Sequence, residues 1–302
     1  MRGDIRKMTG VGHIALTPFG GDGTIDERGI ANIVAVAVEA GCTSLIPLGI
    51  MGEAHKLLEE ERDRVLARYV AEAGDALHVI AGVSSESTVQ AIDRASRALD
   101  LGATGMMMAP PRGSSAGPAL LGHYSSVAEA VSLPLVIQDE PVTTGVKLPA
   151  AFFAQLAEIN TAFAAKVEES PSPPKIAGIR AAAPRLALFG GLGGISLYEE
   201  LGRGAAGIMT GFGFPHILAD ICRLYLDGDT DGARDVFFTY LPLIRFEAQL
   251  GVGGVAIRKR LFFERGLIAT PNARRPSAEL DDDTVRELNE LIQVLGLKEQ
   301  NV

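Results

Sequence analysis

A lysine that follows a short apolar run is the residue in this sequence best suited to covalent chemistry. The run Ala162–Val167 contains Lys166 near its end and is followed by Glu168, Glu169 and a proline-rich turn segment. An apolar stretch of this length between turn residues is typical of a buried strand. Burial lowers the pKa of an amine, and a neutral lysine amine can attack a carbonyl to form a Schiff base. The plainer alternative is an ion pair between Lys166 and Glu168 or Glu169 at the strand end.

Seven further apolar runs accompany this one and alternate with segments of helical periodicity. The eight predicted strands cover residues 12–19 (ending at Pro18), 44–48, 77–81, 105–109, 133–138, 162–167, 186–189 and 207–210. Short helix-to-strand turns with glycine at 41, 102 and 204 repeat one pattern, which parallel βα units require. The even spacing predicts an α/β fold, a closed (β/α)8 TIM barrel. A doubly wound open sheet is the alternative, and it is disfavoured because no Gly-x-Gly-x-x-Gly follows the first strand.

The pattern changes after residue 228, where only helical periodicity continues. Helices are predicted at about 231–249, 255–265 and 281–295. We therefore expect a barrel over residues 1–228 and a C-terminal helical extension over residues 229–302 that packs on it. The extension could cover the barrel or mediate subunit contacts, and the sequence favours neither role.

Composition excludes several functional classes. The net charge of −9 without a basic block argues against nucleic acid as a partner. No apolar run approaches the roughly 18 residues of a membrane span, and the amino terminus has no signal-peptide pattern. Cys42 and Cys222 are far apart and lack metal-ligand spacing, which fits a reducing cytoplasm. We predict a cytoplasmic protein without membrane association, cofactor or metal.

The active site of such a barrel lies at the carboxyl ends of its strands. The residues predicted there are Thr17, Pro18, Gly49–Glu53, Pro110–Arg112, Gln138–Glu140, Lys166, Glu168, Gly190–Gly194, Thr210 and Gly211. Lys166 is the only lysine among them, and it has neither metal ligands nor a His-Asp set beside it. An amine nucleophile is therefore the simplest chemistry that this set offers.

Two glycine-rich turns border the predicted site. Backbone N–H groups of Gly49–Glu53 could hold an anion such as a carboxylate, although an ordinary strand-to-helix turn explains the same residues. Gly190–Gly194 invites a phosphate- or flavin-binding interpretation, but no lysine, arginine or serine is interleaved with its glycines. Close backbone approach to a small ligand is the better explanation of this second turn.

These residues together resemble a known family. The chain resembles the dihydrodipicolinate synthase and N-acetylneuraminate lyase superfamily of class I aldolases over residues 11 to 296. The motifs that carry the resemblance are Thr17-Pro18-Phe19, Gly49-x-x-Gly52-Glu53, Pro141, Gly145, Lys166 and the glycine-rich seventh turn. The resemblance implies an imine between Lys166 and a 2-keto acid, often pyruvate, and a homotetramer or homodimer of barrels.

The departures from the family pattern bear on the substrate. The two threonines that usually hold the keto-acid carboxylate are replaced by Ile50 and Met51, and the usual proton-relaying tyrosine is replaced by Gln138. Each lost hydrogen bond to a charged group removes on the order of 1.5–3 kcal/mol. The arginine that the synthase uses for the aldehyde's carboxylate falls at Thr143, and its second tyrosine falls at Arg112 or Pro111. An orthodox dihydrodipicolinate synthase is therefore not expected.

Proton transfer in this site would need a new carrier, because a glutamine amide is neither an acid nor a base at neutral pH. Lys166 and Glu168 are two residues apart on a strand, so both side chains should face the barrel interior. Glu168 is the first candidate, with Glu53, His55 and Asp139 behind it. The alternative for Glu168 is a purely ionic role beside Lys166 or Arg112.

The sequence thus predicts a Schiff-base lyase, an aldolase or a dehydratase, that acts on pyruvate or a 2-keto-3-deoxy acid; Gln-Asp-x-Pro after the fifth strand resembles some sugar-acid dehydratases. Lys166, Gln138 and Glu168 are the predicted catalytic residues. The predicted substrate-binding residues are Thr17, Gly49, Ile50, Met51, Gly52, Glu53, Arg112, Asp139, Gly190 and Met209. The alternative from another class is a catalytically altered barrel that binds a small keto acid as a sensor or scaffold.

Overall fold

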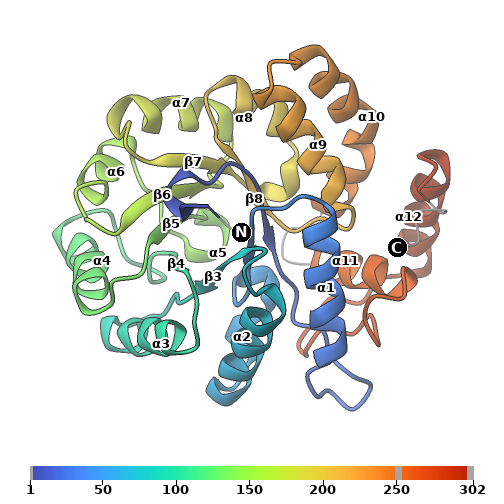
Figure 1. Ribbon diagram of the computed structural model, residues 1–302, viewed down its shortest axis with the longest axis horizontal. Helices are drawn as coiled ribbons and strands as arrows, with labels where there is room; N and C mark the ends of the chain where they lie inside the picture. Colours follow the sequence, from blue (N-terminus) through green and yellow to red (C-terminus); the bar gives the residue numbers. More distant parts are fainter. Residues whose placement is uncertain (1–2, 249–253, 298–302) are drawn as a thin grey trace.

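The computed structural model describes residues 3–248 and 254–297, and within them eight parallel strands close into a barrel in which β8 pairs with β1 (Figure 1). The strands are β1 (Gly10–Ile14), β2 (Ser44–Ile46), β3 (His78–Gly82), β4 (Gly105–Met108), β5 (Leu135–Asp139), β6 (Ala162–Val167), β7 (Ala187–Gly190) and β8 (Gly207–Thr210). They follow one another around the barrel in chain order, as (β/α)8 topology requires. The predicted TIM barrel is confirmed.

A ring of helices surrounds the barrel (Figure 1). These are α1 (Glu27–Glu39), α2 (Glu59–Ala73), α3 (Thr88–Asp100), α4 (Pro118–Ala130), α6 (Ala150–Leu156), α7 (Ser172–Ala182), α8 (Leu197–Gly202) and α9 (Pro215–Leu226). The single turn α5 (Pro141–Thr144) lies inside this ring, directly after β5. Short 3-10 helices add η1 (Ile5–Lys7), η2 (Ile50–Gly52), η3 (Ala54–Lys56) and η4 (Leu192–Gly194). Helix η2 lies in the glycine-rich turn after β2, and η4 lies in the glycine-rich turn after β7. The chain therefore leaves both strands through a single tight helical turn.

Side chains that alternate along the strands fill the barrel interior. An inner cluster of buried residues includes Ile14, Ile46, Val136, Ala164, Phe189 and Met209. Since side chains two residues apart on a strand share a face, Gln138 and Lys166 also point inward, one layer beyond Val136 and Ala164. Gln138 and Lys166 are direct partners in the β5–β6 register. The strand pairing therefore brings these two side chains together at the carboxyl end of the barrel.

The C-terminal helical extension is present as α10 (Thr230–Ala248), α11 (Gly254–Glu264) and α12 (Asp282–Val294). Helix α10 packs against α9, η4 and α12, and α12 lies at the edge of the molecule (Figure 1). Gln249, the predicted end of the first of these helices, lies outside the described residues. Most side chains of α11 are buried, including two charged ones, Arg258 and Lys259. The division into two units at residue 228 stays a prediction.

Two local predictions need correction. The first strand ends at Ile14 and not at Pro18: the N–H of Ala15 makes a last hydrogen bond to the Ile46 carbonyl of β2, and Phe19 instead forms an isolated antiparallel bridge with Ile25. The buried hydroxyl of Tyr69 donates to the Leu16 carbonyl at 2.6 Å and holds the segment between Ala15 and Phe19 in place. The short helix α5 was not predicted. It begins at Pro141, where Glu140 accepts from the N–H of Thr143, and a proline in the first turn favours a helix start.

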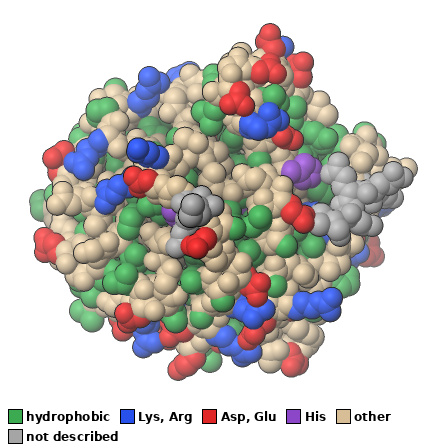
Figure 2. All heavy atoms as spheres, in the orientation of Figure 1, with side chains coloured by type: hydrophobic (Ala, Val, Ile, Leu, Met, Phe, Trp, Pro, Cys, Tyr) green, Lys and Arg blue, Asp and Glu red, His purple; other side chains and the backbone are tan. Residues whose placement is uncertain are grey.

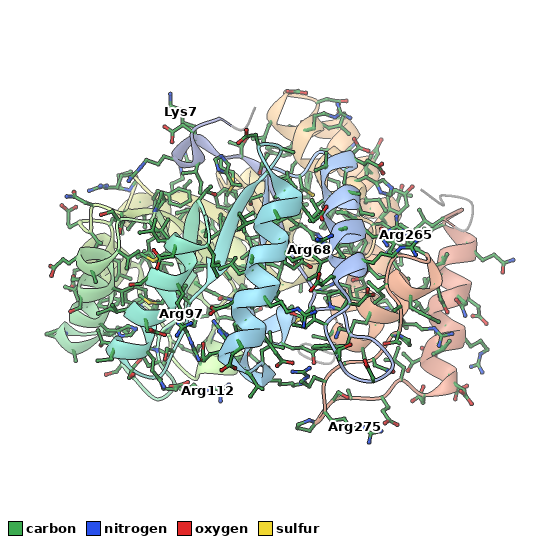
Figure 3. The ribbon with its side chains drawn as sticks, turned by 60° about the horizontal axis from the view of Figure 1, so that its bottom comes forward. Lys7, Arg68, Arg97, Arg112, Arg265 and Arg275 are labelled. Atoms are coloured by element: carbon green, nitrogen blue, oxygen red, sulfur yellow. The ribbon has the colours of Figure 1, made fainter. Side chains whose placement is uncertain are left out.

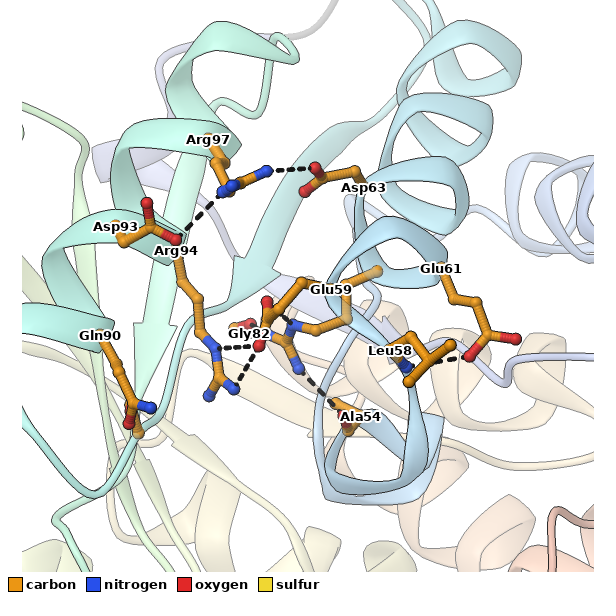
Figure 4. Close-up of polar contacts among 12 residues, drawn as sticks. Ala54, Leu58, Glu59, Glu61, Asp63, Gly82, Gln90, Asp93, Arg94 and Arg97 are labelled. Atoms are coloured by element: carbon orange, nitrogen blue, oxygen red, sulfur yellow. Dashed lines mark hydrogen bonds and ion pairs between the residues drawn. The ribbon is translucent and has the colours of Figure 1, made fainter.

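Polar contacts on the outside fix the loop that follows β2. The buried guanidinium of Arg62 on α2 donates to the carbonyls of Ala54 at 3.1 Å and of Gly82 at 3.0 Å. Ion pairs link α2 to α3, between Glu59 and Arg94 and between Asp63 and Arg97 (Figure 4). Partly exposed pairs of this kind contribute little stability, whereas the buried hydrogen bonds of Arg62 tie α2 to the loop after β2 and to the end of β3.

The two ends of the barrel are distinct surfaces. Figure 3 places Lys7, just before β1, and Arg112, beyond β4, at opposite ends of the molecule. Figures 1 and 2 look onto the end that carries the amino terminus, where acidic and basic side chains are interspersed (Figure 2). Among the described residues, no helix is both long and apolar enough to cross a membrane.

Candidate active site

A cavity of about 180 Å³ lies at the carboxyl ends of the strands. Its walls come from the ends of β1, β4, β5, β6 and β8, from the turns after β2, β5 and β7, and from the extension. The lining residues are Ile14, Gly49, Ile50, Met51, Met107, Gln138, Glu140, Val142, Thr143, Lys166, Glu168, Leu192, Gly193, Ile195, Thr210, Gly211, Glu247, Ala248 and Arg258. The space suits a ligand smaller than a typical drug molecule, whose pockets begin at about 300 Å³.

Lys166 opens onto this cavity from β6 and is paired with Glu168. Its side chain is almost fully buried, and Nζ lies 2.8 Å from Oε2 of Glu168. The same carboxylate oxygen accepts a hydrogen bond from Nε2 of Gln138 at 2.9 Å. The ion pair considered as the plainer alternative is therefore present. It does not exclude chemistry, because all three side chains face the cavity and a carboxylate beside the amine can exchange a proton with it.

The glycine-rich turn after β7 leaves room for carboxylates from the protein. A Cβ atom on Gly191 would overlap the side chain of Glu168, and one on Gly190 would overlap the carboxylate of Glu200. Glycine at both positions thus allows two carboxylates to pack against the turn. Glu168 and Glu200 occupy the space beside Gly190 and Gly191, and neither glycine is among the residues that line the cavity, so the approach of a ligand to this backbone stays a prediction.

Glu200 forms a second layer behind Glu168. It is buried, and Ser172 donates to its Oε1 at 2.5 Å. Burial raises the pKa of Glu200 to about 7, and the nearby charge of Glu168 acts in the same direction. Glu200 therefore carries its proton at a pH where an exposed glutamate is ionised.

The turn after β2 presents apolar side chains to the cavity. Gly49, Ile50 and Met51 line it, whereas Gly52 is buried and is not part of the lining. Thr17 does not reach the cavity, and its hydroxyl donates to the Gly52 carbonyl at 2.6 Å. Thr17 and Gly52 therefore support the turn from below.

Glu53 is turned away from the cavity. Its backbone adopts a left-handed conformation with φ of 56°, and its carboxylate pairs with Lys259 at 2.5 Å and with Lys56 at 3.1 Å. The backbone N–H of Arg274 donates to the same carboxylate. Glu53 thus joins the barrel to the extension, and it has no access to a ligand beside Lys166.

Three further predicted binding residues also lie away from the cavity. Met209 packs in the barrel interior, and the carboxylate of Asp139, fully buried, lies 3.0 Å from Nζ of Lys175. Burial raises the pKa of Asp139 to about 6. Arg112 is exposed near Glu86, and it lines a neighbouring cavity of about 330 Å³ together with His55. That neighbouring cavity shares Gly49, Ile50, Met107, Gln138 and Thr143 with the first.

Two charged residues of the extension were missed by the sequence interpretation. Arg258 on α11 and Glu247 on α10 are buried, line the cavity and pair with each other at 3.2 Å. The missed signal is the basic triplet Arg258-Lys259-Arg260 inside the otherwise apolar run from Val255 to Phe263, of which Arg258 and Lys259 are buried. Charged residues in such a run are rarely buried unless they are paired or bind a ligand.

Fold and site together define a class: a TIM barrel with a buried lysine that faces a cavity from the end of its sixth strand. Sequence comparison is specific about the family. The model of the dihydrodipicolinate synthetase family matches residues 7–295. The chain belongs to this family, and the predicted resemblance is confirmed.

Individual relatives agree with this membership. An uncharacterized DapA-like lyase of Halobacterium salinarum is 32% identical over 298 residues, which cover 98% of this chain and 96% of the relative. L-2-keto-3-deoxyarabonate dehydratase of Azospirillum brasilense is 31% identical over 290 residues and 93% of each chain. The crystal structure of dihydrodipicolinate synthase from Rhodopseudomonas palustris superposes with a TM-score of 0.90 at 33% identity and covers 95% of this chain and 98% of that one.

Proposed function

We propose that this protein is a Schiff-base lyase that acts on a small 2-keto acid through Lys166. The observation that carries the proposal is a buried lysine amine that faces a cavity and lies 2.8 Å from a carboxylate held by a second side chain. Membership of the dihydrodipicolinate synthetase family supports lyase chemistry. The cavity of about 180 Å³ has room for a short keto acid, and the neighbouring cavity of about 330 Å³, which shares Gln138 and Thr143 with it, offers space for the rest of a longer one.

The proposed reaction begins with the amine of Lys166. The ammonium gives a proton to Glu168, and the neutral amine attacks the C2 carbonyl of the keto acid, whose oxygen leaves as water when the imine forms. The protonated imine then acts as an electron sink. In dehydration a base removes the C3 proton to give an enamine, and the C4 hydroxyl takes up a proton and departs as water. In aldol cleavage a base removes the proton of the C4 hydroxyl, the C3–C4 bond breaks with its electron pair entering the enamine, and C4 leaves as an aldehyde. Water then hydrolyses the imine and releases the amine of Lys166. Glu168 lies within hydrogen-bond distance of the nitrogen that becomes the imine and is the proposed proton carrier.

A 2-keto-3-deoxy sugar acid is the proposed substrate class. The relative from Azospirillum brasilense is an L-2-keto-3-deoxyarabonate dehydratase, and this chain has Gln138-Asp139 where the synthase resemblance would give Tyr-Asn. Gln138 binds Glu168 and is not itself an acid or base, so proton transfer falls to the carboxylate. We also propose a cytoplasmic homotetramer or homodimer, by analogy with the family.

Reductive trapping tests the proposal. Wild-type protein is incubated with pyruvate or a keto-deoxy acid, reduced with borohydride and digested for mass spectrometry. We expect a stable adduct on Lys166 and none on Lys175, an internal control that is partly buried, pairs with Asp139 and lies outside the cavity lining. Absence of an adduct on Lys166 across a panel of keto acids would contradict the proposal.

The second candidate is a keto-acid sensor or scaffold, favoured by Ile50, Met51 and Gln138 at positions where the family usually has hydroxyl groups. Calorimetry with Lys166→Ala separates the two. A sensor would bind the acid without turnover, and its affinity would not depend on Lys166. A lyase would lose both the adduct and turnover in this variant.

A further inference from the structure

The buried guanidinium of Arg258 has hydrogen-bonding capacity that the described protein does not use. The side chain is only 3% exposed, and its Nη1 atom has no hydrogen-bond partner among residues 3–248 and 254–297. A buried donor without a partner costs about 1–3 kcal/mol, and more when the group is charged. An unpaired charged donor beside a cavity is therefore expected to have its partner in a ligand.

Glu247 accounts for one edge of this guanidinium only. Its Oε2 accepts from Nε of Arg258 at 3.2 Å, while its Oε1 accepts from the backbone N–H of Gly213 at 2.8 Å. Glu247 is thus held by two elements and keeps Arg258 in a fixed orientation. The Nη1 atom lies near the end of β8, where a Cβ atom on Gly211 would come within 2.5 Å of it. Gly211 and Arg258 both line the cavity that Lys166 faces.

Arg258 is the cation of this cavity best placed to attract an anion. Among the described lining residues the cationic side chains are Lys166, which is paired with Glu168, and Arg258, which is paired with Glu247 through Nε but keeps Nη1 without a partner. Ile50 and Met51 offer apolar side chains at the turn after β2. A guanidinium matches a carboxylate better than any other side chain, because its N–H donors lie in one plane at the spacing of the two oxygens.

We propose that Arg258 is the carboxylate receptor of this cavity, and that it binds the carboxylate of a 2-keto acid whose carbonyl faces Lys166. The inference rests on the proposed function only for the identity of the acid. The substrate carboxylate is thus assigned to Arg258 on helix α11 and not to the backbone of the turn after β2. The C-terminal extension then supplies a specificity-determining residue, and a neutral ketone of the same size is discriminated against.

The test compares an acid with its neutral ester. The half-saturating concentration for borohydride trapping is measured with pyruvate and with methyl pyruvate, in wild-type protein and in the double variant Arg258→Met, Glu247→Gln. The double variant avoids a buried carboxylate without its partner. We expect the value for pyruvate to rise at least tenfold and the value for methyl pyruvate to change less than threefold. Equal changes for the two compounds, or none for pyruvate, would overturn the proposal.

Two further variants guard against a purely structural effect. Arg260→Met removes a cation from the same helix, where it pairs with Glu264 outside the cavity, and should leave the pyruvate value unchanged. Arg258→Lys keeps the charge but loses the planar fork, so it should fall between wild type and the double variant. It also serves as the test if the double variant does not fold. A pyruvate value for Arg258→Lys equal to that of wild type would then count against the proposal.

A failure of imine chemistry is distinguishable from a failure of this inference. If wild-type protein gives no adduct, binding of L-lactate, which has the carboxylate but no ketone, is measured by calorimetry. At least tenfold weaker lactate binding by Arg258→Lys or by the double variant supports the carboxylate site without the Schiff base. Equal lactate affinity of wild type and these variants, or undetectable lactate binding by wild type, overturns the proposed carboxylate site.

Discussion

At the scale of single residues, Glu168 stands at the centre of the candidate site. Its Oε2 is shared by Lys166 and Gln138, and its Oε1 lies 3.4 Å from the backbone nitrogen of Leu192. A carboxylate with three donors around it is fixed in position while one face remains toward the cavity. Glu168 therefore contributes both a negative charge beside the Lys166 amine and a fixed position for that charge.

The first prediction separates imine formation from proton transfer. Glu168→Gln keeps the shape and most hydrogen bonds of the side chain but removes the base. We expect turnover to fall by about 10²–10⁴-fold, the usual contribution of a general acid or base, while the Lys166 adduct still forms at saturating keto acid. Steady-state kinetics and borohydride trapping on the same preparation check this. Unchanged turnover would remove Glu168 from the mechanism.

The second prediction concerns pH and Glu200. Burial raises the pKa of Glu200 from 4.5 to about 7, so the folded protein keeps this proton while the unfolded chain releases it. Stability contributed by the protonated group is therefore full below pH 4.5 and is lost as the pH rises toward 7. Glu200→Gln should be about 1–3 kcal/mol more stable than wild type at about pH 8 and nearly equal to it at about pH 5. Urea unfolding at both pH values measures the difference, and a pH-independent difference would contradict it.

At the scale of elements, the turn after β7 shows how backbone decides the placement of side chains. Gly191 and Gly190 leave space for Glu168 and Glu200, and η4 then brings Leu192 and Gly193 to the cavity wall. A side chain at residue 191 would compete with the carboxylate for the same volume. The turn therefore fixes where the Glu168 and Glu200 carboxylates lie, although it contributes no functional side chain of its own.

The third prediction follows from this packing. Gly191→Ala should displace the Glu168 carboxylate and lower turnover at least tenfold, because misplacement of a catalytic group by about 1 Å can cost 10²-fold. Gly122→Ala is the control, since Gly122 lies within α4 and a Cβ atom added there would meet no other element within 4 Å. That variant should retain full turnover and gain up to about 1 kcal/mol of stability. Equal turnover of the two variants would contradict the packing explanation.

At the scale of the whole molecule, buried ion pairs join the extension to the barrel. Lys259 on α11 contacts Glu53 after β2, and Arg258 and Glu247 together line the cavity at the barrel's end. Lys259 also donates to the Asn272 carbonyl at 3.0 Å. Charges buried between two regions make separation of those regions costly, so barrel and extension are expected to unfold together.

The fourth prediction tests this coupling. Lys259→Met leaves Glu53 buried without its closest partner and should destabilise the protein by about 3 kcal/mol, while unfolding stays a single transition. Arg275→Met breaks an exposed pair with Glu279 and should cost less than about 0.5 kcal/mol. Circular dichroism with hydrogen exchange followed along the chain measures both effects. Loss of protection in 254–297 before the barrel would contradict joint unfolding.

The sequence by itself determined the barrel and its lysine. Apolar runs of strand length, helix-ending glycines and regular spacing depend on local preferences, and these predicted the strand order and placed Lys166 at the end of the sixth strand. The two-residue spacing also placed Lys166 and Glu168 on one face, because side-chain direction along a strand is a local property.

Only the tertiary structure decided which strand-end residues reach the cavity. Thr17, Glu53, Asp139 and Met209 belong to strand ends in the sequence pattern but have their contacts elsewhere, since burial drives each polar group toward the nearest complementary one and each apolar group into the core. Arg258 and Glu247 come to the cavity from helices of the extension, far along the chain from Lys166. Contacts of such long range depend on how helices pack around the barrel, and no local pattern encodes them.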